Sequence, residues 1–158
     1  MGSSDLDDID RVILHALQED ARHNTNAAIS ERAGVSASTV GKRVARLEEC
    51  GIISGYRAEI DYEKAGFPLD VLFICTASIT DRDSFTEQAI RLDGVVNVWE
   101  LMTGERNVYI RAIGASKDDI TRIANELDSI GYAVADEILL RGEYNRPSNR
   151  FDATDSNG

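Results

Sequence analysis

Three cationic side chains and several hydroxyls gather in one short stretch, SASTVGKRVARLEE, which spans residues 36–49. Guanidinium and ammonium groups bind phosphates and guanine edges, and short hydroxyl side chains can approach base edges closely. From Arg32 through Leu47 the chain carries four basic residues and no carboxylate, although its formal net charge is −11. We therefore predict DNA contacts for six residues of this stretch: Ser36, Ser38, Thr39, Lys42, Arg43 and Arg46.

A helix over 37–50 has to present these side chains on one face. At about 100° per residue, Val40, Val44 and Leu47 form an inward seam. The predicted contact residues from Ser38 to Arg46 fall on the opposite arc, as a helix in a DNA groove requires. The alternative is an ordinary solvated helix face, and the preceding elements argue against it.

Two further helices are predicted before this one. The apolar spacing from Leu6 to Leu17 predicts a first helix, and the aspartates at its start suit the positive end of the helix dipole. A second helix over about 26–33 ends at Gly34, and Ser36 stands at the N-cap of the third helix. Helix, short glycine-containing turn and helix form a helix-turn-helix pattern.

The residues after Gly51, IISGYRAEID, alternate around Ser54 and Gly55, which predicts a short hairpin or an extended strand. This segment is a plausible wing that brings Tyr56 and Arg57 near DNA phosphates, so Arg57 joins the predicted contacts. We assign residues 1–60 to a winged helix-turn-helix domain and 61–68 to a linker.

The second half alternates strands and helices in the order β-α-β-β-α-β, which predicts a ferredoxin-like domain over 69–144 and an α+β fold class. The predicted ranges are strand 69–79, helix 84–92, strand 95–103, strand 108–114, helix 117–130 and strand 132–144. Helices would cover one sheet face, so Trp99 and its apolar neighbours on the other face predict packing against a second copy. The polar tail over 145–158 is predicted to be disordered.

Composition restricts the protein class. The chain has no apolar run long enough for a membrane span and no basic-then-apolar leader, so we expect a cytoplasmic protein. The 28 acidic residues exceed 17 Lys plus Arg, and only three are Lys, as in proteins of salt-accumulating halophiles; an ordinary acidic protein is the alternative. We expect no metal site, no cofactor and no catalysis, since no nucleophile-base set or phosphate-cradling loop can be assembled.

Several motifs resemble the Lrp/AsnC, or feast/famine, family of transcription regulators. They are LDDIDRVILHALQEDAR, ISERAGVSASTVGKRVARLEECGIISGYRAEID, YEKAGF and VVNVWELMTGERNVYIRAIG. The resemblance covers about residues 5–142. It implies a winged helix-turn-helix that binds operator DNA, joined to an effector-binding domain called RAM, in dimers that often form tetramers or octamers.

The resemblance also implies an amino-acid effector held near one turn and the last strand. The corresponding residues here are Thr103, Gly104, Glu105, Arg106, Asn107, Ala135 and Glu137. The family often has Asp where this chain has Asn107, and favours Thr where it has Ala135 and Glu137. A Glu137 carboxylate would repel a ligand carboxyl group unless Arg106 screens it. The effector is then a basic amino acid, another metabolite, or absent.

Two other function classes stay open on sequence alone. One is an oligomeric metabolite-sensing module with little DNA-binding activity. The other is an enzyme or regulatory subunit built on the ferredoxin-like sheet, which the missing catalytic groups argue against. Titration with amino acids, a DNA shift assay and a turnover screen separate the three.

Overall fold

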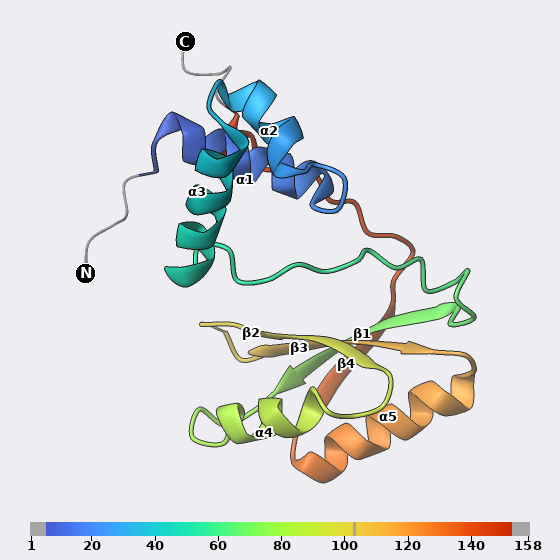
Figure 1. Cartoon of the computed structure of the whole chain (residues 1–158). Helices are drawn as coiled ribbons and strands as arrows, with labels where there is room; N and C mark the ends of the chain where they lie inside the picture. Colours follow the sequence, from blue (N-terminus) through green and yellow to red (C-terminus); the bar gives the residue numbers. More distant parts are fainter. Residues whose placement is uncertain (1–5, 103, 153–158) are drawn as a thin grey trace. The chain divides into compact units, whose positions relative to one another are not determined.

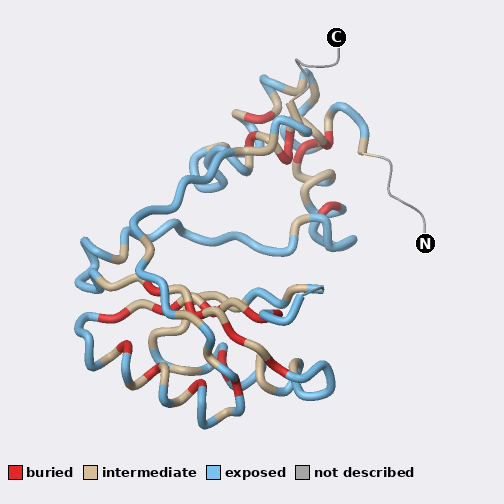
Figure 2. Tube along the Cα trace, turned by 180° about the vertical axis from the view of Figure 1, so that it is seen from behind, coloured by how far each residue is buried: buried red, intermediate tan, exposed pale blue. Residues whose placement is uncertain are grey.

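The computed structural model describes residues 6–102 and 104–152. The chain divides into two compact units, one made of residues 1–58 and 144–158 and the other of residues 59–143. Figure 1 shows the helices of the first unit and the sheet with its two helices in the second. Buried positions gather inside each unit, and the connecting segments are exposed (Figure 2).

The first unit holds the three predicted helices. They are α1 (Asp8–Asp20), α2 (Asn26–Ala33) and α3 (Ala37–Glu49). Each begins at a side-chain cap: Asp7, Thr25 and Ser36 accept hydrogen bonds from backbone N–H groups one turn later. Their apolar faces meet in one core built on six buried residues: Ile13, Leu14, Ala16, Ile29, Val40 and Leu47.

Two glycines shape the helix-turn-helix. Gly34 caps α2 with φ 68°, in the left-handed region that glycine adopts without strain. Gly41 lies where α2 approaches α3, since a Cβ there would stand 3.1 Å from the Asn26 amide nitrogen. The mid-helix glycine therefore accommodates a close approach between the two helices.

For residues 52–61 the sequence left open a short hairpin or an extended strand, and the structure shows no hairpin there. Within the described chain this segment pairs with no strand, and all its residues except Ile53 are exposed. The backbone N–H of Ile53 donates to Leu47 O at 3.0 Å, and the Tyr56 hydroxyl donates to Glu48 at 2.8 Å. These two contacts hold the start of the segment against the end of α3. The rest of the segment continues as an extended, unpaired connection (Figure 1).

The prediction of a disordered tail is wrong for residues 145–152, which include a short helical turn packed on the helical unit. Ser148 caps a short 3₁₀ turn, η1 (Asn149–Phe151), and Phe151 packs against the core of the helical unit. The Ser148 N–H donates to the Gln18 side chain at 3.2 Å, and Arg11 donates to Arg150 O at 3.1 Å. One apolar side chain thus anchors an otherwise polar segment. Residues 153–158 lie outside the described residues.

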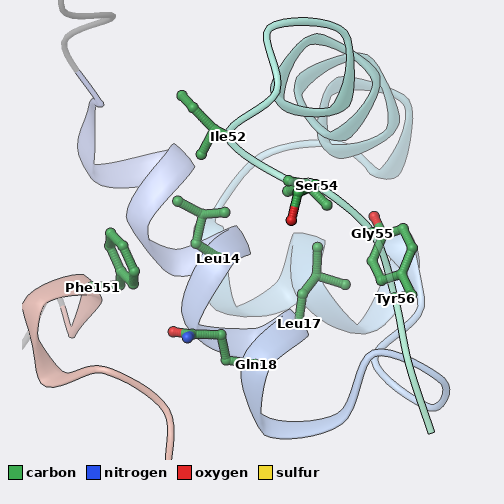
Figure 3. Close-up of a pocket in the computed structure, with 9 residues that line it drawn as sticks. Leu14, Leu17, Gln18, Ile52, Ser54, Gly55, Tyr56 and Phe151 are labelled. Atoms are coloured by element: carbon green, nitrogen blue, oxygen red, sulfur yellow. The ribbon is translucent and has the colours of Figure 1, made fainter. Parts of the chain in front are cut away.

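Phe151 borders a cavity of about 220 Å³ beside α1. Figure 3 shows Leu14, Leu17 and Gln18 of α1 on one side, the segment from Ile52 to Tyr56 on another, and Phe151 from the tail. Three segments distant in sequence therefore enclose this space within the helical unit.

The second unit is a four-stranded antiparallel sheet in the order β2-β3-β1-β4. Its elements are β1 (Leu69–Thr76), α4 (Arg82–Ala89), β2 (Val95–Glu100), β3 (Val108–Gly114), α5 (Lys117–Ile130) and β4 (Ala133–Leu139). This is the predicted β-α-β-β-α-β order of a ferredoxin-like domain, with three strands shorter than predicted. Both helices cover the same face of the sheet (Figure 1).

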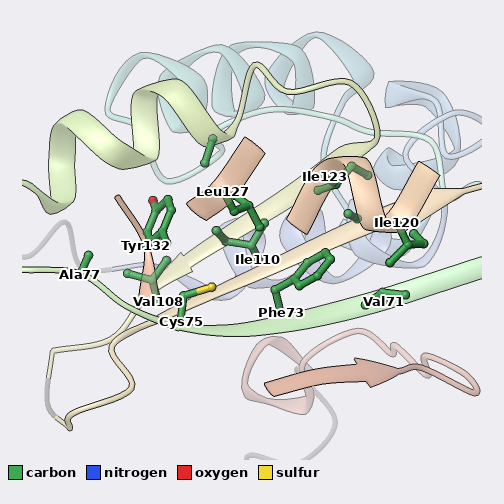
Figure 4. Packing of buried hydrophobic residues seen from close by; sticks show 12 residues of the cluster. Val71, Phe73, Cys75, Ala77, Val108, Ile110, Ile120, Ile123, Leu127 and Tyr132 are labelled. Carbon is green, nitrogen blue, oxygen red and sulfur yellow. The ribbon is translucent and has the colours of Figure 1, made fainter. Parts of the chain in front are cut away.

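The core of this unit lies between the helices and the sheet (Figure 4). Phe73 and Ile110 point from the strands toward Ile123 and Leu127 of α5, and all four are fully buried. The helix predicted over 84–92 ends at Ala89, and Ile90, its C-cap, is exposed.

Candidate nucleic-acid interface

The first turn of α3 carries a cluster of hydroxyls. Ser36 Oγ accepts from the Thr39 N–H at 3.2 Å and lies 3.1 Å from Ser38 Oγ and 2.9 Å from Thr39 Oγ1. The Ser36 hydroxyl is therefore engaged as the helix cap. Ser38 is exposed and Thr39 half-buried, so these two stand at the positive end of the helix dipole, where anions are stabilised.

Two of the predicted cationic contacts are already paired with carboxylates. Arg43 Nη1 donates to Asp7 at 2.6 Å and to Asp10 at 3.2 Å, and Arg46 Nη2 donates to Asp10 at 2.5 Å. The arc lacks acid along α3 itself, as predicted, but the start of α1 brings two carboxylates to it. The cationic face is neutralised along this edge.

Local sequence explains why the acids stand there. Asp7 is the N-cap of α1 and Asp10 is its N3 residue, and each side chain accepts from the other's backbone N–H, at 2.9 and 3.3 Å. This reciprocal capping fixes both carboxylates at the end of α1 that meets α3. The Asp10 N–H and the Arg43 guanidinium hold the pKa of Asp7 below its ordinary value, and the Asp7 carboxylate raises the pKa of Arg43.

The other edge of α3 is open. Lys42 is exposed, and its ammonium forms no recorded ion pair with any described residue. With exposed Ser38 it forms an edge that a phosphate or base can reach directly. Arg57, in the extended segment, is likewise exposed and without an ion pair in the described ranges.

Tyr56 is tied to the last turn of α3. Its hydroxyl donates to Glu48, and partial desolvation together with this carboxylate raises its pKa to about 12. This hydrogen bond secures the extended segment to α3, and the place of Tyr56 near a DNA phosphate stays a prediction.

Sequence reasoning missed the role of Asp7 and Asp10. It assigned the acids at the start of α1 to the helix dipole alone. The available signal was the Asp-x-x-Asp spacing of a capping box, which marks these carboxylates as fixed. Nothing in the sequence indicated that α3 would supply arginines to them.

The predicted effector turn has one residue with a structural role. Asn107 is buried at 8% exposure, and its side-chain amide donates to Ala77 O and accepts from Ala77 N–H, both at 2.9 Å. Both ends of the amide are hydrogen-bonded within the fold, so the Asn107 side chain has a structural role. Its contact with an effector stays a prediction.

The rest of the turn lies near the end of β1 and β4. Glu105 O accepts from the Thr76 hydroxyl at 2.9 Å, and Arg106 forms an ion pair with Asp136. Gly104, Glu105 and Arg106 are exposed. Thr103, also predicted, lies outside the described residues.

On β4, Ala135 and Glu137 flank Asp136 and are exposed. Ala135 lies at an irregularity in the β1–β4 register, where Ile74 faces Asp136 and Cys75 faces Val134. The Arg106 guanidinium pairs with Asp136, the residue between the two predicted contacts, and forms no ion pair with Glu137 among the described residues. The structure brings Arg106 to β4, but to a different carboxylate.

Two kinds of site are absent from residues 6–102 and 104–152. These contain no group of three His, Cys, Asp or Glu side chains placed to hold a metal ion. They also contain no helix that is long and apolar enough to cross a membrane.

Residues 6–54 match the family model described as winged helix-turn-helix DNA-binding. Together with the three-helix fold and the exposed edge of α3, this match defines the class of the protein. It is a DNA-binding transcription regulator with an N-terminal winged helix-turn-helix.

Relatives of known identity place it more narrowly. The leucine-responsive regulatory protein of Rhizobium meliloti is 46% identical over 114 residues, covering 69% of this chain and 70% of that protein. Regulatory protein AsnC of Escherichia coli K12 is 28% identical over 85% of this chain and 89% of its own. The chain belongs to the Lrp/AsnC family.

Solved structures extend the likeness across both units. A feast or famine regulatory protein from M. tuberculosis, crystallised with L-methionine, has a TM-score of 0.78 and 25% identity. The match covers 89% of this chain and 95% of that one. The α+β class predicted from sequence is confirmed by this agreement and by the winged-helix match.

Proposed function

We propose that this regulator contacts operator DNA through α3, with Ser38, Thr39 and Lys42 at base edges and phosphates on the open edge. Arg43 joins them at base edges, and Arg46 and Arg57 bind phosphates. The observation that carries the proposal is the Lys42 edge, exposed and unopposed by carboxylate among the described residues. An acidic protein keeps such an edge where it must meet a polyanion.

The test compares Lys42→Ala with Lys117→Ala in a gel-shift titration. Both changes remove one exposed lysine, and Lys117 begins α5 in the other unit. We expect Lys42→Ala to weaken DNA binding and to reduce the slope of log K against log salt by about 0.9, the loss of one phosphate contact. Equal affinities for the two variants would refute the proposed contact.

Arg43→Ala tests the paired edge. We expect roughly 5- to 150-fold weaker binding to the operator, the range for losing a base contact. Because Arg43 pairs with Asp7 and Asp10, circular dichroism must first show that the variant is folded. An unchanged operator affinity in a folded variant would remove Arg43 from the contact set.

We further propose that the protein acts as a homodimer, which can assemble further, through the helix-free face of the sheet. Register places Trp99 opposite Tyr109, Ile74 opposite Tyr109, and Leu72 opposite Ile138, all on the face away from α4 and α5. Trp99 is 43% exposed, and such an apolar face favours a partner. Two copies would present two α3 helices to half-sites about one helical turn apart.

Analytical ultracentrifugation of the wild-type chain and of Trp99→Glu tests this assembly. We expect a dimer or larger assembly for the wild type and a shift toward monomer for the variant. A monomeric wild type at micromolar concentration would exclude the dimer.

For the effector, we propose an amino acid near Arg106, as suggested by the L-methionine bound to the structural relative. The exposed Arg106 guanidinium can bind a carboxylate ligand if it leaves Asp136. Calorimetric titration with the twenty amino acids tests this, and Asp136→Asn should tighten the binding of any carboxylate ligand. Absence of heat for all twenty would exclude an amino-acid effector.

We also propose a surface adapted to high salt, as the excess of acid over base suggests. A cytoplasmic location is proposed with it, because a regulator that binds operator DNA works where the DNA is. Thermal midpoints should rise with KCl because added salt screens the repulsion among carboxylates. A midpoint that falls between low and molar KCl would argue for an ordinary acidic protein.

A further inference from the structure

The acids at the start of α1 compensate the arginines of α3 charge for charge. Asp7 and Asp10 bind Arg43 and Arg46, which are separated from them by more than thirty residues in sequence. Two cations and two anions leave this edge of α3 with no net charge. A regulator that needs cationic charge toward DNA has thus placed two carboxylates on two of its arginines.

The two carboxylates differ in exposure. The Asp10 side chain is 1% exposed and bridges both guanidiniums, so it cannot leave without disrupting the contact between α1 and α3. The Asp7 side chain is 47% exposed and pairs with only one guanidinium, that of Arg43, at the surface. Arg43 itself is 30% exposed, so an incoming anion can reach the guanidinium that Asp7 holds.

An exposed ion pair of this kind is weak. Solvent screens it, and ordering two side chains offsets much of the attraction. A phosphate or base edge that fits Arg43 well can therefore displace Asp7, but a poorly placed one cannot. Random DNA offers phosphates in no fixed register with the other side chains of α3, while an operator fixes the register.

We propose that Asp7 is an affinity-limiting residue that retains Arg43 when the protein lies on random DNA and is displaced from it at the operator. The proposal rests on the proposed contact of Arg43 with DNA. The wild-type complex with random duplex then lacks the Arg43 contact, and the operator complex gains it at the expense of the Asp7 pair. Removing the Asp7 charge strengthens operator binding by the energy of the pair. It strengthens random binding by the Arg43 contact, which is the smaller of the two because the pair outcompetes that contact in the wild type.

The variant Asp7→Asn isolates the charge from the helix cap. Asn is as good an N-cap as Asp, and its side-chain oxygen can still accept from the Asp10 N–H, now bonded at 2.9 Å. The matched control is Asp20→Asn, which removes one carboxylate charge from the same unit. Asp20 lies at the far end of α1 and pairs with His23, not with α3.

Binding is measured by fluorescence anisotropy against two duplexes over a range of salt. One has random sequence, and the other is selected from a randomised pool by the wild-type protein. On random duplex we expect Asp7→Asn to bind about 2- to 5-fold more tightly, with a salt slope steeper by about 0.9. The operator affinity should rise by at least as much, with little change in its salt slope, because Arg43 already contacts the operator in the wild type. Asp20→Asn should leave both salt slopes unchanged.

A double-mutant cycle assigns the effect to the pair. In the Arg43→Ala background, Asp7→Asn should no longer change the salt slope. The inference fails if Asp7→Asn behaves like Asp20→Asn, or if its effect persists without Arg43. A purely structural pair would lower the thermal midpoint without strengthening random binding.

The same measurements separate this inference from the proposed function. If Arg43→Ala leaves both affinities unchanged in a folded protein, the proposed DNA contact of Arg43 fails and the role of Asp7 fails with it. If Arg43→Ala weakens operator binding while Asp7→Asn matches its control, only the role of Asp7 is refuted.

Discussion

Asp10→Asn should be the most damaging isosteric change in the helical unit. The substitution keeps the size and shape of a side chain that is 1% exposed and removes its charge. Arg43 and Arg46 then face a neutral amide at 3.2 and 2.5 Å, and an amide nitrogen in either position would oppose a guanidinium donor. The contact between the start of α1 and the middle of α3 loses its anion.

The size of the effect follows from burial and exposure together. A hydrogen bond to a charged group contributes about 1.5–3 kcal/mol, and orphaning a fully buried charge costs about 3–5 kcal/mol. Arg46 is 48% exposed, so water can solvate its released guanidinium and reduce the loss. We therefore expect Asp10→Asn to lower the free energy of unfolding by about 2–3 kcal/mol.

The assay is urea unfolding of the whole chain, followed by helical circular dichroism. With a slope of about 1–3 kcal/mol per molar urea, the midpoint should fall by roughly 0.7–3 M. The control is Glu19→Gln, which removes a carboxylate that holds Arg32 at 2.6 Å on the exposed surface. That pair is screened by solvent, so its midpoint should barely move.

The reasoning is refuted if the two variants unfold at the same urea concentration. It is also refuted if added salt abolishes the difference between wild type and Asp10→Asn, since screening reaches an exposed pair far more than a buried one. Either outcome would mean that burial of the Asp10 carboxylate contributes nothing beyond a surface ion pair.

Three further outcomes follow from single contacts. Gly41→Ala should stabilise the protein by up to about 1 kcal/mol, because alanine has the higher helix propensity. The Asn26 amide, 3.1 Å from the new Cβ, is the end of an exposed side chain and can move aside. A loss of stability would show that Asn26 and α2 cannot shift to make room. Phe151→Ala should lower the free energy of unfolding by about 1–2 kcal/mol. The loss is smaller than for a fully buried Phe, because the ring is only partly buried against the helical core. An unchanged urea midpoint would show that the tail contributes no packing. The pKa of Asp7 is lowered in the fold, first by the backbone N–H it caps and then by Arg43. Its contribution to stability is therefore complete above the unfolded pKa of about 4 and is lost as the pH falls from there through the lower pKa of the folded state. The thermal midpoint of Asp7→Asn should depend less on acid than that of the wild type, and parallel curves would contradict this sign.

Local patterns in the sequence were sufficient for the helices of the first unit. The bounds of α2 agree with the prediction at both ends, and α3 ends one residue before its predicted end. Ser36 and Gly34 are read correctly because a cap is formed by residues next to each other in the chain. Phe151 was missed since one apolar residue in a polar tail has no periodicity to reveal that it packs.

Contacts between residues far apart in the chain were also out of reach for Asn107 and for the choice between hairpin and extended strand after Gly51. The Asn107 side chain is occupied because Ala77, thirty residues away, presents both a donor and an acceptor to it. The alternation in residues 52–61 indicated extended chain correctly, but a hairpin needs a second strand, which the fold does not supply to this segment.

The sequence alone determined where helices and strands begin, which faces are apolar and which stretch of α3 is cationic, because these depend on residues within one or two turns of each other. Tertiary structure decided which of those cations are free. Arg43 and Arg46 meet Asp7 and Asp10 only because α1 packs across α3, while Lys42 stays open on the other edge. Charge pairing depends on distance in space, and packing alone sets that distance for residues far apart in the chain.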